Sequence, residues 1–149
     1  MIPIKQLIRD GNWLNLSLPE EVLFRIRVNS FAPFDYAGVD NPEKCEALPA
    51  GVLRWIMRLD VLNASKFYVH SSNLKRSLRV IDGEGYSFEV DSDGHLCCLS
   101  DFAKRSGLYA LFFERLMPKV AISGAVLFRL PDEETEYSLD VAKGTLAEL

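Results

Sequence analysis

Alternating apolar and polar positions run through most of the chain and predict β-strands. The clearest run covers residues 52–62, where every second residue is apolar and three of the residues between are charged. A strand places successive side chains on opposite faces, whereas a helix would spread these charges around its circumference. We therefore expect a half-buried strand with two unlike faces, an apolar one and a solvent-facing one: Leu53, Trp55, Met57, Leu59 and Val61 against Arg54, Arg58 and Asp60. Substitution of Arg54 should then cost little stability.

Similar alternation recurs in other parts of the sequence. Further runs lie at residues 22–28, 86–90, 120–130 and 137–141. Residues 78–80 precede the glycine-containing segment 82–85, and alternation resumes at once, which is typical of a β-hairpin. Gly124 falls on the apolar face of its run and indicates a bulge or a close backbone approach.

One stretch has helical spacing instead. Ser100 is a typical N-cap for residues 100–117, and Pro118 follows Met117 and ends the run. Between these ends, apolar residues recur three and four positions apart, although Gly107 weakens the middle by about 1 kcal/mol relative to Ala. We predict a helix here. At the N-terminus, Ile4, Leu7 and Ile8 fit either a helical turn or a short strand.

Several short strands separated by Gly and Asp turns predict an all-β fold. The pattern favours an immunoglobulin-like antiparallel β-sandwich with one helix inserted in a connection, at residues 100–117. A chain of 149 residues that is 48% hydrophobic can bury a substantial core. We therefore expect a single domain over residues 1–149.

Charge and composition exclude several classes of partner. The chain carries 17 Lys and Arg against 21 Asp and Glu, a net charge of −4. This balance disfavours nucleic acid and anionic membrane surfaces. No apolar run approaches the roughly 18 residues of a membrane span, and the start does not match a signal peptide. We expect a cytoplasmic protein without membrane insertion, and export of a longer precursor stays open.

The order of these features resembles a family of bacterial immunoglobulin-like domains of unknown function, related to the mycobacterial immunoprotective extracellular protein. The resemblance covers residues 52–141. It follows a strand ending at Asn63, then Ser71-Ser-Asn-Leu74, Leu78-Arg-Val-Ile-Asp-Gly-Glu-Gly-Tyr-Ser-Phe88, Pro118, Gly124-Ala-Val-Leu-Phe128, Leu130-Pro131 and Tyr137-Ser-Leu139. It implies the immunoglobulin-like fold and no catalytic residue. The family carries Pro-Gly where this chain has Pro118-Lys119, and its members are usually exported.

The cysteines and histidines offer one candidate metal site. His95 and Cys97 would share a face of a strand, and Cys98 would point to the other face. A tetrahedral zinc site would need further ligands from elsewhere in the fold. His95, Cys97 and Cys45 are the candidates, and the alternative is that the cysteines are buried hydrophobic residues. Three cysteines are too few for a disulfide scaffold, so we expect reduced thiols and no bound metal.

Other motifs argue against catalysis. The segment 91–94, Asp-Ser-Asp-Gly, resembles the start of a calcium loop, but Ser100 stands where the loop requires a bidentate Glu. We interpret this segment as a turn. The sequence contains no nucleophile elbow, P-loop or dinucleotide-binding motif. We expect no catalytic residue, no cofactor and no enzymatic activity.

The long connection at residues 29–51 is the candidate partner site, because aromatic residues on proline-restricted loops are typical binding anchors. Phe34 and Tyr36 lie two positions apart, so an extended segment would point both to one side, flanked by Asp35 and Asp40. We predict that Phe34, Tyr36, Asp35 and Asp40 bind a protein partner with a basic patch. The alternative is that the aromatic residues cap one end of the fold.

These patterns favour a non-catalytic binding or accessory module that recognises a protein partner. A bacterial immunity-type protein that neutralises a toxin fits the acidic composition equally well. A small metal-dependent enzyme or sensor, using His95, Cys97 and Cys45, is the alternative from another class.

Overall fold

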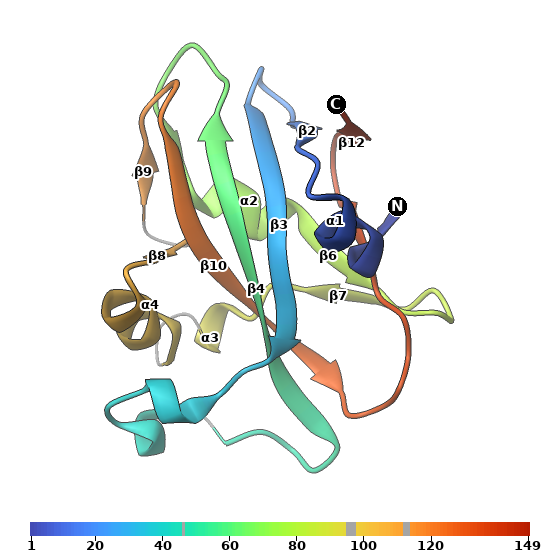
Figure 1. Cartoon of the computed structure of the whole chain (residues 1–149), viewed down its shortest axis with the longest axis vertical. Helices are drawn as coiled ribbons and strands as arrows, with labels where there is room; N and C mark the ends of the chain where they lie inside the picture. The colour runs from blue at the N-terminus through green and yellow to red at the C-terminus, as the bar shows by residue number, and fades with distance from the viewer. Residues whose placement is uncertain (46, 95–97, 112–113) are drawn as a thin grey trace.

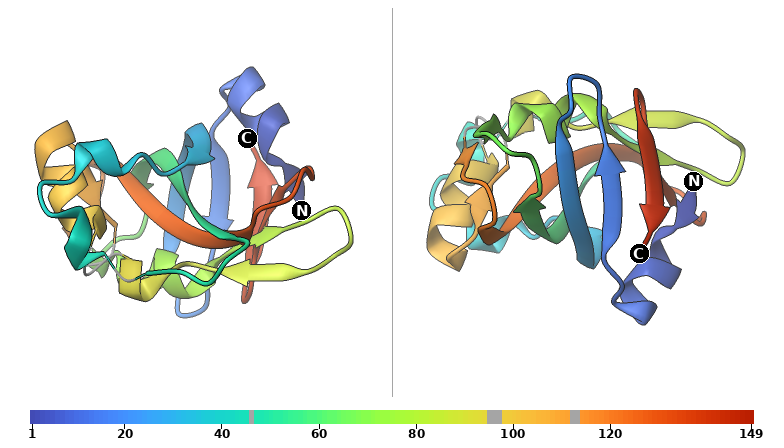
Figure 2. Two further views of the ribbon diagram at one scale, coloured as in Figure 1. Left: turned by 90° about the horizontal axis from the view of Figure 1, so that it is seen from below. Right: turned by 90° about the horizontal axis from the view of Figure 1, so that it is seen from above.

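The chain is mainly β, with short helices in the connections (Figure 1). The structure is a computed structural model of the whole chain, and it describes residues 1–45, 47–94, 98–111 and 114–149. Two sheets share the main hydrophobic core and form two layers when the molecule is seen end-on (Figure 2). The prediction of a β-rich chain is confirmed.

The larger sheet has the strand order β12-β2-β3-β4-β10-β8. Its strands are β2 (Leu14–Ser17), β3 (Leu23–Pro33), β4 (Val52–Asn63), β8 (Tyr109–Ala110), β10 (Ala121–Pro131) and β12 (Thr145–Glu148). Neighbouring strands are antiparallel except for β8, which pairs parallel with β10. The strands β3, β4 and β10 contain 11, 12 and 11 residues, so they run the length of the molecule.

The smaller sheet has the order β1-β11-β6-β7. Its strands are β1 (Ile2–Pro3), β6 (Leu78–Ile81), β7 (Ser87–Glu89) and β11 (Ser138–Val141). The predicted hairpin is β6–β7, and the Asp82 carboxylate holds its turn by accepting hydrogen bonds from the backbone N–H groups of Glu84 and Tyr86, both at 2.9 Å. A two-stranded sheet pairs β5 (Val69–His70) with β9 (Arg115–Leu116).

The helices are short and lie in the connections. They are α1 (Ile4–Asp10), α2 (Ser72–Ser77), α3 (Ser92–Gly94), α4 (Ser100–Ser106) and the 3₁₀ turns η1 (Tyr36–Gly38) and η2 (Pro42–Lys44). The predicted helix at 100–117 is therefore too long. It ends at Ser106 because Gly107 adopts a left-handed conformation with φ of 71°, after which the chain pairs as β8 and β9. Among the described residues, no helix is long and apolar enough to cross a membrane.

The main core lies between the two sheets. It includes inward-facing residues of both sheets and of α1, among them Leu7, Phe24, Ile26, Met57, Leu59, Val61, Val80, Val126, Phe128 and Leu139. Apart from Leu7, which lies on α1, these residues belong to the alternating runs that predicted strands. At the start of β4 the prediction is less accurate, since Leu53 is 37% exposed and Trp55 is partly buried.

The outer face of β4 and β10 is covered over part of its length, which corrects the sequence prediction for Arg54, whereas Arg58 is exposed as predicted. A second core packs Ile56 and Leu127 from these strands against Phe34 and against Phe102 of α4. Arg54, predicted to face solvent, is only 3% exposed. Burial of an arginine requires a counter-charge, and that partner is distant in the sequence.

Gly124 marks the close approach that the sequence indicated. A Cβ atom at this position would lie 2.5 Å from Cγ of Leu111, which is itself fully buried. The residue is glycine because the Leu111 side chain fills the space above the strand.

We expect Gly124→Ala to destabilise the protein by about 1–3 kcal/mol, because the added methyl group overpacks against Leu111. Leu111→Ala alone should cost about 2–5 kcal/mol through the cavity it leaves. The double variant should cost less than the two single variants together, because each change accommodates the other. Urea unfolding of the four proteins measures these free energies, and strictly additive costs would contradict the contact.

Candidate functional site

The predicted anchor Phe34 lies in the second core. Its side chain is 6% exposed, and its ring packs edge-on against Phe102 and Tyr36, with centroids 5.3 and 5.0 Å away. The Tyr36 hydroxyl accepts a hydrogen bond from Arg54 Nη1 at 2.8 Å. Both aromatic residues therefore hold their segment on the outer face of the sheet, as the capping alternative describes.

The two predicted acidic residues of this segment also make local contacts. The Asp35 carboxylate accepts a hydrogen bond from the backbone N–H of Ala37 at 2.9 Å and caps η1. Asp40 lies 3.0 Å from Arg105 of α4 in an exposed ion pair. The structure therefore brings Phe34, Tyr36, Asp35 and Asp40 together as a brace, in which each of the four side chains makes a contact within the protein.

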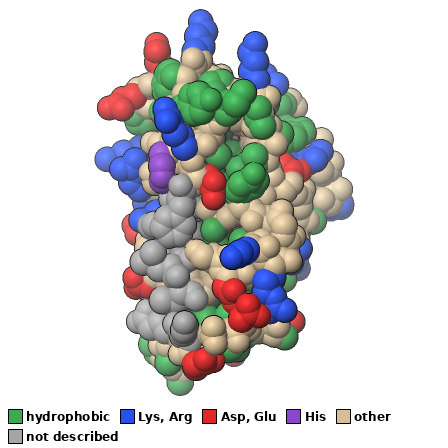
Figure 3. Space-filling model, turned by 90° about the vertical axis from the view of Figure 1, so that its left-hand side faces the viewer, with side chains coloured by type: hydrophobic (Ala, Val, Ile, Leu, Met, Phe, Trp, Pro, Cys, Tyr) green, Lys and Arg blue, Asp and Glu red, His purple; other side chains and the backbone are tan. Residues whose placement is uncertain are grey.

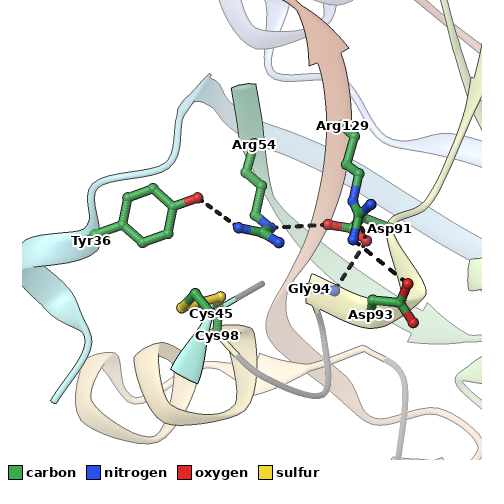
Figure 4. Close-up of polar contacts among 8 residues, drawn as sticks. All are labelled: Tyr36, Cys45, Arg54, Asp91, Asp93, Gly94, Cys98 and Arg129. Atoms are coloured by element: carbon green, nitrogen blue, oxygen red, sulfur yellow. Dashed lines mark hydrogen bonds and ion pairs between the residues drawn. A yellow bond between two sulfur atoms is a disulfide. The ribbon is translucent and has the colours of Figure 1, made fainter. Parts of the chain in front are cut away.

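A buried charge network lies beneath this brace (Figure 4). Arg54 Nε lies 3.2 Å from Asp91 Oδ2, and Arg129 Nε lies 3.0 Å from Asp91 Oδ1. Arg129 Nη2 also approaches Asp93 Oδ2 at 3.6 Å. The side chains of Arg54 and Asp91 are 1% and 3% exposed. The network therefore gives the buried Arg54 a counter-charge, which Asp91 shares with the partly exposed Arg129.

Asp91 is held in place by the chain around it. Its backbone N–H donates to the carbonyl of Leu127 on β10 at 2.7 Å, and its carboxylate accepts from the backbone N–H of Gly94 at 3.0 Å. A side chain at position 94 would clash with the Asp91 carboxylate, which explains the glycine in this turn. The segment at 91–94 is thus a carboxylate-anchored turn, as interpreted from the sequence.

Cys45 and Cys98 form a disulfide, which corrects the expectation of reduced thiols (Figure 4). Their Cα atoms are 5.4 Å apart, and the bond joins positions 53 residues apart in the sequence. It ties the segment after η2 to the start of α4. Disulfides are typical of oxidising compartments, so the cysteine count no longer supports a cytoplasmic location.

The candidate metal site is not assembled by the described residues. Cys45 is bonded to Cys98, while His95 and Cys97 lie outside the described residues. In the part of the chain that the structure describes, no three His, Cys, Asp or Glu side chains are grouped to hold a metal ion.

A more prominent surface lies at one end of the long strands, where β3 begins and β4 ends. Hydrophobic side chains gather there with Lys and Arg side chains (Figure 3). Five large apolar side chains are each between 41% and 52% exposed: Leu23, Phe67, Tyr68, Met117 and Val120. We call these five residues the apolar tip.

Two buried polar side chains hold the tip together. The amide nitrogen of Asn63 donates to the carbonyls of Phe67 and Leu116, both at 2.9 Å. This one side chain therefore joins the loop after β4 to the end of β9. Ser65 extends the connection to β3, because its hydroxyl oxygen accepts from the backbone N–H of Leu23 at 2.8 Å. Asn63 is fully buried and Ser65 is 5% exposed, so the tip loops are fixed from beneath.

Cations lie on the loops of the apolar tip, and Glu21 lines the hollow beside Leu23 and Phe67. Lys66 and Lys119 are exposed on the same two loops, and the backbone N–H of Lys119 donates to the carbonyl of Asn63 at 3.0 Å. The Arg115 guanidinium lies over the Tyr68 ring at 4.6 Å, a cation–π contact. The tip therefore combines an apolar centre with a partly basic rim. Hydrophobic periodicity does not predict this surface, because its residues lie mostly in loops, which follow no regular spacing.

Comparisons with known proteins support the fold alone. No family model and no curated protein matches the sequence. A conserved hypothetical protein from Bacillus anthracis has a similar structure, with a TM-score of 0.54 at 10% identity over 84% of this chain and 86% of that chain. A candidate lipoprotein, ycdA, from Bacillus subtilis has a TM-score of 0.48 at 11% identity. The alignment covers 85% of this chain and 36% of that longer one.

We expect Asp91→Asn to destabilise the protein by about 3–5 kcal/mol, because it removes the buried carboxylate that pairs with both Arg54 and Arg129. The matched control is Asp140→Asn, whose exposed carboxylate lies 4.0 Å from the N-terminal amine. This control should cost less than about 0.5 kcal/mol. Urea unfolding measures both, and similar costs for the two variants would show that the network contributes nothing.

Thiol counting tests the disulfide. Unfolded without reductant, the protein should react with a maleimide at one of its three cysteines, because Cys45 and Cys98 are bonded to each other. Unfolded with reductant, it should react at all three. Mass spectrometry counts the adducts, and three adducts without reductant would rule out the bond.

Proposed function

We propose that this chain is a non-catalytic, immunoglobulin-like β-sandwich module that binds a protein partner through its apolar tip. The observation that carries the proposal is the exposure of five large apolar side chains on loops that buried hydrogen bonds fix in place. This surface replaces the segment 34–40 as the candidate partner site.

The arrangement of the sheets supports the immunoglobulin-like part of the proposal. Two mostly antiparallel sheets enclose one core, and their connecting loops gather at the strand ends. Loops in that position, held by rigid strands, are the usual binding surfaces of sandwich domains.

The composition of the apolar tip favours a protein partner. Contiguous exposed apolar patches rimmed by polar residues mark protein interaction sites. Aromatic residues and Met are enriched in such interfaces, and Phe67, Tyr68 and Met117 supply them here. Because Asn63 already fixes the loops, little loop entropy is lost on binding. The basic rim favours a partner with acidic residues around its own apolar centre.

The proposal predicts position-specific crosslinking. A p-benzoylphenylalanine photo-crosslinker in place of Tyr68 should form one discrete covalent adduct in a lysate of the source cells. The matched control is the same replacement at Tyr86, a tyrosine on the β6–β7 turn that is 64% exposed against 50% for Tyr68. Met117→Asp should abolish the Tyr68 adduct by placing a charge in the apolar centre, while the melting temperature stays nearly unchanged.

Once the crosslinked partner is identified and purified, Phe67→Ala should weaken binding by about 2 kcal/mol or more, as expected for an aromatic anchor that becomes buried in the complex. Isothermal titration measures the loss. Adducts that are equal at Tyr68 and Tyr86, or that survive Met117→Asp, would refute the apolar tip as the binding surface.

A further inference from the structure

A groove lies at the opposite end of the same long strands. Its volume is about 710 Å³, and its walls come from the end of β3, the start of β4 and the β10–β11 connection at residues 132–137. Pro33, Leu53 and Trp55 form the strand side, and Lys5 of α1 stands at its edge. We call this hollow the acidic groove.

Carboxylates dominate the rim of the acidic groove. Asp132, Glu133, Glu134 and Glu136 line it and are exposed, and Lys5 is the one cation among its lining residues. None of the four carboxylates forms an ion pair with another described residue. The groove therefore has an unneutralised negative field that attracts a cation.

Aromatic rings form the inner end of the groove. A narrower cavity of about 80 Å³ opens among Phe31, Trp55 and Tyr137. The Phe31 ring lies 4.9 Å from the Trp55 ring and 5.9 Å from the Tyr137 ring, and Trp55 and Tyr137 are also 5.9 Å apart. Faces of aromatic rings attract cations, and the rings also accept an aliphatic stem.

Two buried polar groups in this aromatic cluster make no hydrogen bond to any described residue. They are the indole Nε1–H of Trp55 and the hydroxyl of Tyr137, whose side chain is 7% exposed. Burial, reinforced by the carboxylates of Glu133 and Asp82, raises the pKa of Tyr137, so its hydroxyl stays protonated. Both groups are hydrogen-bond donors, and the indole can only donate. The site therefore needs an acceptor as well as a cation.

A peptide segment with a basic side chain supplies both. We propose that the acidic groove binds an extended basic segment of a protein, with a Lys or Arg side chain between the aromatic rings and the carboxylates. A backbone carbonyl next to that side chain accepts from Trp55 Nε1. The two donors are covered in the free protein, so binding displaces the exposed, flexible side chains of Lys5 or Glu136 that line the inner cavity. The proposal goes beyond the apolar tip, because it uses a different surface.

The probe is a capped pentapeptide with one central Lys between alanines, added to the full chain labelled with ¹⁵N. The chain has two tryptophans, so a Trp13→Phe background leaves one indole N–H signal, that of Trp55. We expect this signal to shift downfield in a saturable way, because a carbonyl becomes its acceptor. The peptide with norleucine in place of Lys keeps the aliphatic stem but lacks the ammonium group, and it should bind at least about tenfold more weakly. The peptide with Glu in place of Lys should not bind.

Variants that remove either the negative charges or the positive charge of the acidic groove test the proposal further. Glu133→Gln with Glu136→Gln should weaken the Lys peptide at least about fivefold, whereas Lys5→Gln should tighten it about twofold by removing the competing cation. The matched control is Glu148→Gln, an exposed carboxylate on β12, which should leave the affinity unchanged. Phe67→Ala at the apolar tip should also leave it unchanged, so failure of one proposal does not imply failure of the other.

Several outcomes would overturn the proposal. They are no saturable shift with the Lys peptide, equal binding of the norleucine peptide, and an affinity that the Gln variants at the rim do not change. A further outcome would show a site for free amines instead of a protein segment. In that outcome n-butylammonium binds as tightly as the Lys peptide, and the Trp55 signal stays in place.

Discussion

The second core, on the outer face of β4 and β10, depends on one carboxylate, that of Asp91. Arg54 and Arg129 face each other in register on β4 and β10, and like charges side by side oppose burial. Asp91 lies between them and pairs with both. Once the two charges are compensated, the neighbouring Ile56 and Leu127 can be covered by the segment 34–45 and α4. Without Asp91, this face would stay in water, as its alternating pattern suggests.

The positions of the strands could be predicted from the sequence, but the burial of Arg54 on the polar face of β4 could not. Alternation reports which side chains are apolar, and it located β3, β4, β10 and the β6–β7 hairpin because each buries one face. It does not report which distant residue compensates a charge. Asp91 is 37 residues from Arg54, so the burial of Arg54 could be read only from the folded chain. The helix prediction failed at Gly107 for a related reason, since pairing with β10 outweighed helical spacing.

Candidate binding surfaces were harder to predict than strands. The aromatic residues at 34 and 36 looked like anchors because they lie in a proline-rich connection, yet their contacts turn inward. Phe67 and Tyr68 occupy a short loop whose sequence carries no comparable signal. The sequence predicted Asn63 as the last residue of a strand, but not that its buried amide connects the carbonyls of Phe67 and Leu116. The acidic run at 132–136 was visible too, but the aromatic cluster beside it comes from three separate parts of the chain.

The long strands also connect the two candidate binding surfaces directly. β3, β4 and β10 each have the apolar tip at one end and the acidic groove at the other, about 35 Å apart for strands of this length. A pull between bodies bound at the two ends would act along the strands. Antiparallel ladder bonds lie across that direction, so the load would shear many of them together instead of opening them one by one. A module with this geometry transmits tension between its two ends without changing its length.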